Sequence, residues 1–392
     1  MSRLVMNLEA LHHNLKTLNN LFSANNCNWT VVTKVMCGMP EIIDALIRMG
    51  VQSFGDSRVQ NIRNQLGPVP ELETWYLRVP TLSGVEEIVS NYNVSLNSEL
   101  KIILKLNEVA EKLGVIHNII IMIELGDLRE GILPGKLIEF YERALNLPNI
   151  RVLGIGSNLG CMSGTVPQPD QLVQLALYRE LLELKFKKKL PVISGGSSAL
   201  LPLLIKGQIP KEINHFRVGE ALFLGTNLVD GGLLPYLRND MMTLEAEICE
   251  IKEKVLAPMG EVSENISTFS QPSAEPAETQ RVGQRGYRAL VDIGHLDSDI
   301  SGLTPVDERF TMAGAASDIT VVNLGVEHHN LNVGDTINFH INYSALLRLM
   351  SSPYVKKCFS PTFEEFFKLH GDDRIELPSL EKKFWGEGTE TE

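Results

Sequence analysis

The sequence predicts an α/β protein: an N-terminal TIM barrel followed by a mainly β C-terminal domain. In the first 230 residues, short β-branched or apolar runs alternate with longer segments whose apolar residues recur every three or four positions. This alternation is typical of repeated βα units. Beyond residue 235 the pattern changes to the period-two alternation of half-buried strands.

Eight runs qualify as barrel strands, and eight βα units in about 225 residues match a TIM barrel better than an open, doubly wound sheet. The runs are TVVTKV (30–35), VQSFG (51–55), TWYLRV (74–79), NVSLN (93–97), HNIIIMIEL (117–125), RVLGIGSN (151–158), LPVISGG (190–196) and HFRVGEALFLG (215–225). On such a barrel, functional groups gather at the C-terminal ends of the strands.

Helical patterns separate these runs. PEIIDALIRMG begins at Pro40, which suits the first turn of a helix, and SELKIILKLNEVAEKLG ends at Gly114, which suits a C-terminal stop. A third pattern is DQLVQLALYRELLELKFKK. Each would cover the barrel with its apolar face.

The predicted organisation has three parts. Residues 1–235 form the barrel, residues 236–360 form the β-rich domain, and residues 361–392 form a C-terminal tail. Within the second part, residues 264–286 are polar and rich in Ser, Pro and Gln, and we expect a mobile loop there.

Composition excludes several classes of protein. The formal net charge of −12 disfavours nucleic acid as a partner. No run approaches 18 uninterrupted apolar residues and the N-terminus MSRLVMNLEA lacks a leader pattern, so we expect a cytoplasmic protein without a membrane span. Five scattered cysteines, never in a C-x-x-C pair, predict reduced thiols without disulfides or a metal site.

Lys34 stands at the end of the first predicted strand, on the side of the barrel where sites form. A buried ammonium is costly unless it is paired or chemically committed. Partial burial also lowers the pKa of a lysine and frees its amine to attack a carbonyl carbon. From this position alone, a nucleophilic lysine and a lysine snorkelling at a strand end both remain open.

The stretches VMNLEALHHNLK, VVTKVMCG and GDSR (55–58) resemble the fold-type III pyridoxal-phosphate enzymes, the alanine racemase superfamily, and within it the alanine/ornithine racemase group. The resemblance runs from about residue 3 to residue 358. It implies a PLP-dependent amino-acid racemase with pyridoxal 5'-phosphate held as an aldimine on Lys34. It also implies ornithine or another small or basic amino acid as the substrate.

The resemblance assigns further residues to the cofactor. In SGGSSA, serines would bind the phosphate; in HFRVGE, an arginine would face the pyridine nitrogen and two backbone N–H groups would complete the phosphate cradle; in NYSALL, a tyrosine would contact the phosphate; in GIGSNLG, an asparagine would lie beneath the ring. These residues are Asn158, Ser197, Ser198, Arg217, Gly219, Glu220 and Tyr343.

Arg217 bears on the choice of reaction. A guanidinium stays protonated, so a pyridine nitrogen that it contacts stays unprotonated and withdraws electrons weakly. A decarboxylase of this fold would be expected to carry a carboxylate there. The residue therefore favours racemisation.

Racemisation needs two acid/base groups on opposite faces of Cα, and Lys34 supplies one. In IGHLDSD, His295 falls where alanine racemases carry a tyrosine of the partner subunit, and its ordinary pKa suits the task. The substrate-binding candidates are Arg129, Cys161, Ser317 and Asp318. Because the family's sites are shared, the resemblance implies a homodimer.

Two alternatives stay open at this point. A non-catalytic PLP homeostasis protein would share the barrel but lack a β domain, and this chain has about 125 residues of one. Another fold-type III enzyme, such as a decarboxylase or a D-amino-acid lyase or dehydratase, would share both parts. Arg217 argues against the decarboxylase.

Overall fold

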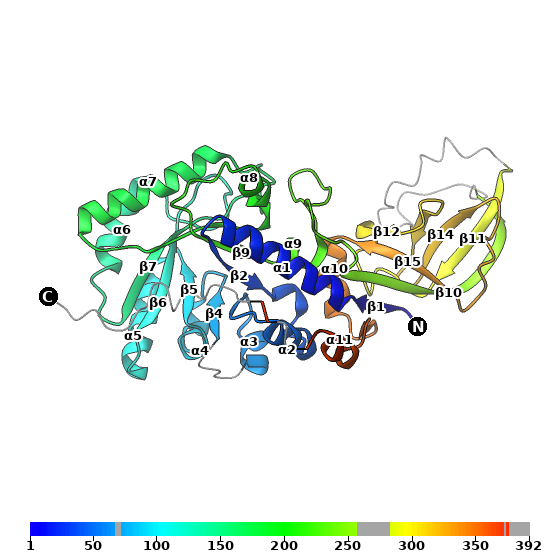
Figure 1. Cartoon of the computed structure of the whole chain (residues 1–392), viewed down its shortest axis with the longest axis horizontal. Helices are drawn as coiled ribbons and strands as arrows, with labels where there is room; N and C mark the ends of the chain where they lie inside the picture. Colours follow the sequence, from blue (N-terminus) through cyan, green and yellow to red (C-terminus); the bar gives the residue numbers. More distant parts are fainter. Residues whose placement is uncertain (67–71, 257–282, 372–373, 376–392) are drawn as a thin grey trace. The chain divides into compact units, whose positions relative to one another are not determined.

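The computed structural model describes residues 1–66, 72–256, 283–371 and 374–375. Eight parallel strands form a closed barrel, which confirms the predicted TIM-barrel class (Figure 1). The first and last strands pair with each other and exclude the open sheet. The strands are β2 (Asn28–Val32), β3 (Ser53–Asp56), β4 (Glu73–Tyr76), β5 (Val94–Asn97), β6 (His117–Met122), β7 (Ile150–Gly156), β8 (Val192–Gly196) and β9 (His215–Val218).

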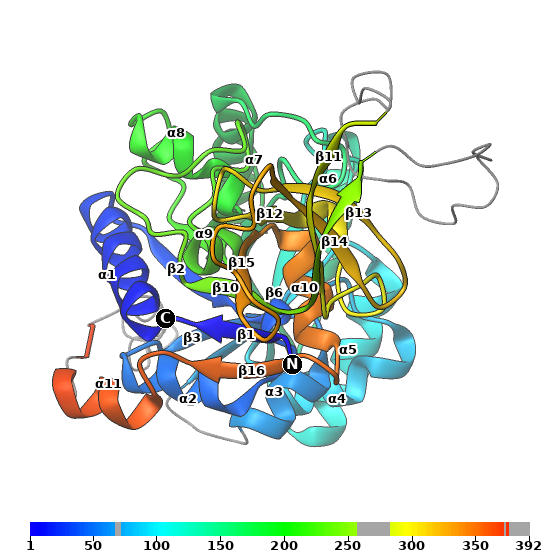
Figure 2. The ribbon, with the colours of Figure 1, turned by 90° about the vertical axis from the view of Figure 1, so that its right-hand side faces the viewer.

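Helices form an outer ring around these strands (Figure 2). They are α1 (Leu8–Ala24), α2 (Pro40–Arg48), α3 (Val59–Leu66), α4 (Val85–Asn91), α5 (Leu100–Leu113), α6 (Leu137–Ala144), α7 (Pro169–Phe186), α8 (Leu201–Ile205) and α9 (Glu220–Leu224). Pro40 begins α2, and Gly114 ends α5 in the left-handed conformation at a φ of 67°, as predicted. Within the described ranges, no helix combines the length and apolar character needed to span a membrane.

Five predicted strands end at least two residues earlier than expected, and after two of them, β2 and β9, a short helical element begins within the predicted run. Strand β2 stops at Val32, and Lys34 instead opens a 3₁₀ turn (Lys34–Met36) that Cys37 terminates at a φ of 51°. Strand β9 stops at Val218, and the remainder of the predicted run forms α9. In both places an apolar run continues past the strand, and periodicity alone does not separate a short buried strand from a short buried helix.

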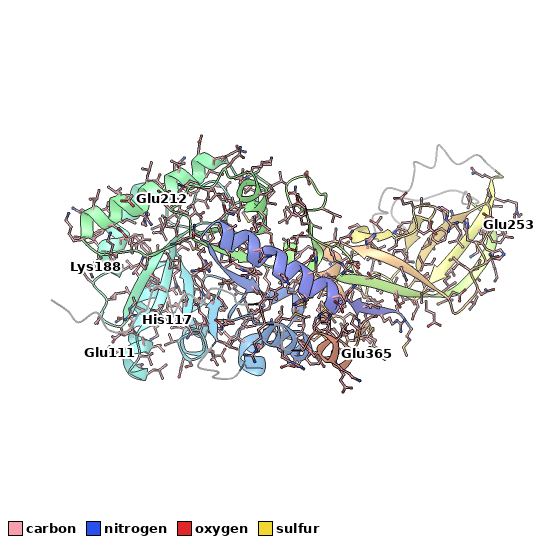
Figure 3. The ribbon with its side chains drawn as sticks, viewed as in Figure 1. Glu111, His117, Lys188, Glu212, Glu253 and Glu365 are labelled. Carbon is pink, nitrogen blue, oxygen red and sulfur yellow. The ribbon has the colours of Figure 1, made fainter. Side chains whose placement is uncertain are left out.

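The barrel interior is apolar over much of its length. Trp75, Leu96, Ile120 and Met122 belong to one cluster of fully buried side chains. His117, at the start of β6, lies among buried groups and shares a hydrogen bond with a serine hydroxyl on β5 (Figure 3). Burial lowers the pKa of His117 to about 4, so this histidine is neutral and structural at ordinary pH.

The second compact unit comprises Met1–Leu11 and Arg238–Leu369 and is mainly antiparallel β, which confirms a β-rich C-terminal domain. Its strands follow the order β12-β15-β10-β11-β14-β13. They are β10 (Met242–Val255), β11 (Arg285–Val291), β12 (Leu303–Pro305), β13 (Thr311–Ala315), β14 (Thr320–Gly325) and β15 (Thr336–Ile341).

The N-terminal residues differ from the predicted boundary of 1–235. Strand β1 (Arg3–Met6) pairs antiparallel with β10 and parallel with β16 (Lys356–Phe359), so the first eleven residues cluster with the second unit. These partners are more than 200 residues away in the sequence, where local patterns carry no information about pairing.

The C-terminal region holds two helices, α10 (Tyr343–Ser351) and α11 (Phe363–His370). Helix α11 falls within the predicted tail (361–392), whose residues 376–392 lie outside the described ranges. Thr362 and Glu365 cap its first turn reciprocally, a Thr-x-x-Glu pattern that the sequence contains. Most of the predicted mobile loop, residues 264–282, also lies outside the described ranges, and β11 begins at Arg285.

The buried cluster generates a stability prediction. Ile120→Ala removes a fully buried side chain from the barrel interior and should lower the free energy of unfolding by about 2–5 kcal/mol. Leu184→Ala, on α7 at a side chain that is 66% exposed, should change it by less than about 0.5 kcal/mol. Urea denaturation followed by circular dichroism measures both. Equal midpoints for the two variants would contradict the assignment of the core.

Candidate active site

Lys34 follows β2 on a turn that neighbouring strands hold in place. Thr33 donates from its hydroxyl to the Asp56 carboxylate over 3.2 Å, and the Arg58 N–H and the Asn61 side-chain amide donate to the same carboxylate. Asp56 is fully buried, and burial raises its pKa. The Gly-Asp-Ser-Arg motif therefore anchors the residue directly before Lys34.

The pKa of the Lys34 amine is lowered, and desolvation is the main cause. The side chain keeps exposed surface, yet the protein around it removes enough water to disfavour the ammonium. The Arg129 cation lowers this pKa further, whereas Cys161, Asp56 and Glu220 act in the opposite direction. A neutral amine is thus accessible to Lys34 at a lower pH than to an ordinary lysine.

Arg217, near the end of β9, is 4% exposed and surrounded by hydrogen-bond acceptors. It donates from Nη2 to the Ser157 carbonyl over 2.8 Å and to Asn158 Oδ1 over 2.7 Å. It also donates from Nη1 to the Ser194 hydroxyl. Burial lowers the pKa of Arg217 to about 10, and the group remains a cation at neutral pH.

A polar chain continues behind Arg217 into the barrel. Ser194 shares a 2.8 Å hydrogen bond with His215 Nδ1, and His215 Nε2 lies 3.0 Å from the Thr30 hydroxyl. The imidazole stacks on Trp75, with ring centroids 4.3 Å apart. Burial, followed by the Arg217 charge, lowers the pKa of His215 well below its usual range, so the ring is neutral.

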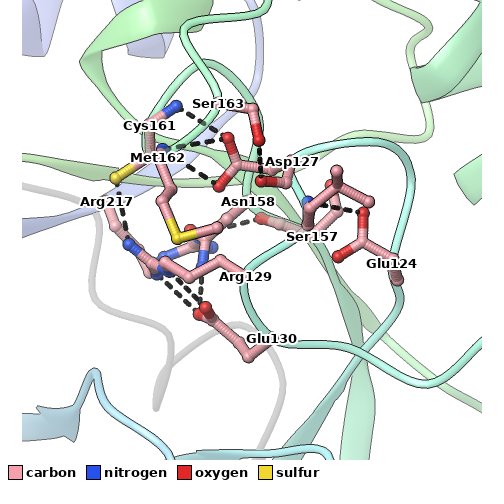
Figure 4. Close-up of polar contacts among 11 residues, drawn as sticks. Glu124, Asp127, Arg129, Glu130, Ser157, Asn158, Cys161, Met162, Ser163 and Arg217 are labelled. Carbon is pink, nitrogen blue, oxygen red and sulfur yellow. Dashed lines mark hydrogen bonds and ion pairs between the residues drawn. The ribbon is translucent and has the colours of Figure 1, made fainter.

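The loops that follow the neighbouring strands β6 and β7 bring four side chains into one network (Figure 4). Arg129 donates from Nε and Nη2 to the Glu130 carboxylate, the latter over 2.6 Å. Arg129 Nη1 lies 3.0 Å from Cys161 Sγ. Asn158 donates from its Nδ2 to Glu130, so the network continues directly to Arg217.

Asp127 ties these two loops together. Its buried carboxylate accepts the backbone N–H groups of Cys161 and Met162 at 3.0 and 3.1 Å, and its carbonyl accepts the Ser163 hydroxyl. Gly131 lets the first loop double back: its φ is 148°, and a Cβ there would lie 2.3 Å from a backbone nitrogen of residue Glu124. The positions of Arg129 and Cys161 are thereby coupled.

The predicted phosphate-binding serines follow β8. Ser198 is buried, and its hydroxyl accepts the N–H of Ala221 over 3.2 Å. Ser197 caps the 3₁₀ turn after the strand by accepting the N–H of Ala199. The hydroxyl of Ser198 therefore lies at the start of α9, where the Gly-Glu pair of the predicted cradle also sits.

Gly219 precedes α9 and packs tightly on the first strand. A Cβ at this position would lie 2.8 Å from the Val32 carbonyl oxygen. Glu220 opens the helix, and burial raises the pKa of its carboxyl while the Thr226 hydroxyl and the Lys34 charge lower it. Small size at position 219 thus allows β9 and α9 to approach β2, next to the Lys34 turn.

The remaining four candidates belong to the second unit. The His295 N–H donates to the carbonyl of Ala316, and the Leu296 N–H donates to the Ser317 carbonyl over 2.8 Å, so these residues lie on adjacent loops. Ser317 and Asp318 are exposed. Tyr343 is the first residue of α10, whose Ala345 carbonyl accepts a hydrogen bond from Ser298 of the His295 loop.

The barrel unit thus brings nine sequence-predicted residues to the ends of its strands: Lys34, Arg129, Asn158, Cys161, Ser197, Ser198, Arg217, Gly219 and Glu220. Sequence reasoning missed four residues that hold them: Asp127, Glu130, Ser194 and His215. Ser194 and His215 could have been found in the sequence, because they are polar residues inside barrel strands and buried polar groups need hydrogen-bond partners. Asp127 and Glu130 read as ordinary loop residues.

Comparisons with known proteins bear on the family to which the chain belongs. Residues 6–227 match the family model of the alanine racemase N-terminal domain. The chain is 34% identical over 359 residues to an ornithine racemase from Acetoanaerobium sticklandii, covering 91% of this chain and 98% of that protein. It is 30% identical over 360 residues to a lysine racemase from Thermotoga maritima, covering 92% and 99%.

The fold has solved counterparts. The alanine racemase from a D-cycloserine-producing Streptomyces lavendulae has a TM-score of 0.69 at 17% identity, covering 93% of this chain and 98% of that one. This likeness extends over both compact units. By its family model and its full-length relatives, the chain belongs to the alanine racemase family and is an amino-acid racemase that depends on pyridoxal 5'-phosphate.

Proposed function

We propose that this racemase acts on ornithine or lysine and exchanges the α-hydrogen through Lys34 and a second acid/base group, His295. The two full-length relatives support the substrate class, because they are an ornithine racemase and a lysine racemase. The observation that carries the proposal is the Lys34 amine, which is desolvated and lies within the electrostatic reach of Arg129. A neutral amine beside a carboxylate-binding cation suits an amino-acid substrate.

The donor set fits the cofactor. Lys34 provides an amine for the cofactor aldehyde, and Arg217 provides a buried cation to oppose the pyridine nitrogen, with Asn158 beside it. The hydroxyls of Ser197 and Ser198 and the N–H groups of Gly219 and Glu220 would bind the phosphate. Tyr343, from the second unit, is a further proposed phosphate contact.

Bound pyridoxal phosphate would supply electron withdrawal from Cα. Lys34 Nζ would take or return the α-proton on one face, and the His295 imidazole would do so on the other. Because burial lowers the pKa of Lys34, its neutral form is available to accept that proton. The Arg217 cation would oppose protonation of the pyridine nitrogen of a bound cofactor, which would favour rapid return of the proton to Cα over competing reactions.

The substrate needs recognition at both ends. Arg129 would bind the carboxylate, and Cys161, which contacts Arg129 Nη1, would border the same place. The distal ammonium of ornithine or lysine needs an acidic neighbour. Glu220 on the barrel and Asp318 on the second unit are the proposed candidates, together with Ser317 as a polar contact.

We further propose a homodimer with shared sites. The loops that carry Arg129 and Cys161 expose large apolar side chains: Leu128 at 71%, Leu133 at 64% and Met162 at 59%. Leu296, next to His295, is 72% exposed. Exposed apolar side chains gathered on functional loops are typical of an interface. His295 of the partner subunit would then face the Lys34 amine.

A reducing compartment is the proposed location. All five cysteines, including Cys161 beside Arg129, carry free thiols. The cytoplasm keeps thiols in this state, and an oxidising compartment would expose the site thiol to modification.

The lowered pKa of Lys34 predicts a selective reactivity. In the cofactor-free protein at neutral pH, a limiting amount of an amine-acylating reagent should modify Lys34 ahead of Lys136, whose side chain is 72% exposed. Arg129→Ala should slow the labelling, because loss of that cation raises the pKa of Lys34. Peptide mass spectrometry measures both sites, and preferential labelling of Lys136 would contradict the prediction. In the holoenzyme, Lys34→Ala should abolish the visible absorbance of the bound cofactor.

Substrate choice has a direct readout. In deuterium oxide, the holoenzyme should exchange the α-hydrogen of ornithine or lysine at least about tenfold faster than that of alanine, since an ion pair to the distal ammonium adds binding energy. Proton NMR of the α-position follows all three amino acids in one mixture. Faster exchange of alanine would overturn the substrate assignment and leave the racemase class intact.

Shared sites predict complementation between inactive variants. Lys34→Ala and His295→Ala should each lose most racemase activity. After mixing and reassembly, heterodimers regain one intact site, so activity should return to about a quarter of the wild-type value. Polarimetry measures the recovery. No recovery, with heterodimers demonstrated by native mass spectrometry, would show that Lys34 and His295 do not act across a subunit interface.

A further inference from the structure

Glu130 occupies a central place among the site cations, although the proposed reaction assigns it no role. Its carboxylate accepts Arg129 Nε and Nη2 on one side and Asn158 Nδ2 on the other (Figure 4). Its side chain is only 11% exposed. A mostly buried carboxylate that faces a guanidinium in this bidentate geometry forms a directional contact, unlike a surface ion pair.

The carboxylate decides which way the Asn158 amide points. An ionised carboxylate only accepts hydrogen bonds, so Asn158 must turn its Nδ2 toward Glu130. Asn158 Oδ1 then faces Arg217 and accepts its Nη2 over 2.7 Å. A reversed amide would place two donors together at Arg217 and two acceptors together at Glu130. One negative charge therefore orders the contacts of both arginines.

Glu130 also determines what Arg129 can still bind. The carboxylate takes the Nε–H and one Nη2–H, and Cys161 Sγ takes one Nη1–H. Among the described residues these contacts use three of the five guanidinium donors, which leaves one on each terminal nitrogen. Two such donors match one incoming carboxylate. The hydrogen bonds that Arg129 donates to Glu130 also raise the pKa of Arg129, so the guanidinium stays charged.

We propose that Glu130 is a positioning residue that holds Arg129 and Asn158 as one rigid bracket and so presents the two remaining Arg129 donors to the substrate carboxylate. The inference rests on the proposed role of Arg129 in the racemase. The proposal gives a role to an anionic residue that acts only through its neighbours, Arg129 and Asn158. The next residue, Gly131, has a φ of 148° and admits no Cβ, because a Cβ would lie 2.3 Å from the Glu124 backbone nitrogen.

A carboxylate probe tests the bracket without turnover. Propionate, which has no amino group, is titrated into the holoenzyme, and its binding is followed through the visible absorbance of the cofactor. Glu130→Gln should raise the Kd for propionate by about tenfold, because the charge that orients Arg129 is lost while the side-chain shape is kept. The Kd for propylamine, which has no carboxylate, should stay within about twofold. The matched control is Glu139→Gln. Glu139 lies on α6, its carboxylate is exposed and pairs with Lys136, and its substitution should change neither Kd.

A double-mutant cycle separates positioning from a general structural effect. If Glu130 acts through Arg129, then adding Glu130→Gln to Arg129→Lys should weaken propionate binding by less than about twofold further. Additive losses, or wild-type propionate binding by Glu130→Gln alone, would overturn the proposal. Should Glu130→Gln fold poorly, Glu130→Asp keeps the charge on a shorter side chain and should weaken propionate binding while sparing propylamine; equal weakening of both would also overturn it. Absence of α-hydrogen exchange with every amino acid would refute the proposed reaction and leave the propionate result to decide the bracket.

Discussion

Burial of the Arg217 guanidinium constrains the side chains around it at the C-terminal ends of the barrel strands. Moving such a cation out of water costs several kcal/mol unless oxygen acceptors replace its hydration. The acceptors come from β8 and from the loop after β7, and two of the side chains are themselves constrained: Ser194 by a neutral His215, and Asn158 by the Glu130 carboxylate. One buried charge is thus accompanied by a neutral group behind it and a negative group beside it, and the charges of Arg129 and Cys161 act on the pKa of both Arg217 and Lys34.

The barrel and its functional edge were predictable because both follow from local patterns. Alternating strand and helix periods specify βα units, and parallel topology then brings the ends of all eight strands to one edge. For that reason Lys34, Arg129, Asn158, Cys161 and Arg217, which lie at the ends of four different strands, were expected to meet there, and contacts or electrostatic coupling link them. Their chemical roles came from the family resemblance, since spacing alone left Lys34 ambiguous.

The unpredicted features depend on partners far away in the sequence. Strand β1 pairs with β10 and β16, which no local period reveals, so the first residues were placed in the wrong unit. Lys34 lies on a turn rather than in a strand, and the preceding residue, Thr33, donates a hydrogen bond to Asp56, 23 positions later. Glu130 lies in a charged loop segment that resembles solvated surface until the adjacent loop supplies Asn158. Tertiary partners, which propensity does not encode, decided each case.

Asp127 constrains how the two loops that carry Arg129 and Cys161 can change in evolution. Its carboxylate and carbonyl fasten the loop after β7 to the loop after β6, so the segments bearing Cys161 and Arg129 form one mechanical piece. An insertion or deletion in either loop would displace the contents of both. Changes of substrate range within this lineage should therefore proceed by point substitutions while both loops keep their lengths, or by replacement of both loops together. The free variation in length and sequence that is usual for barrel loops should be confined to the loops after other strands.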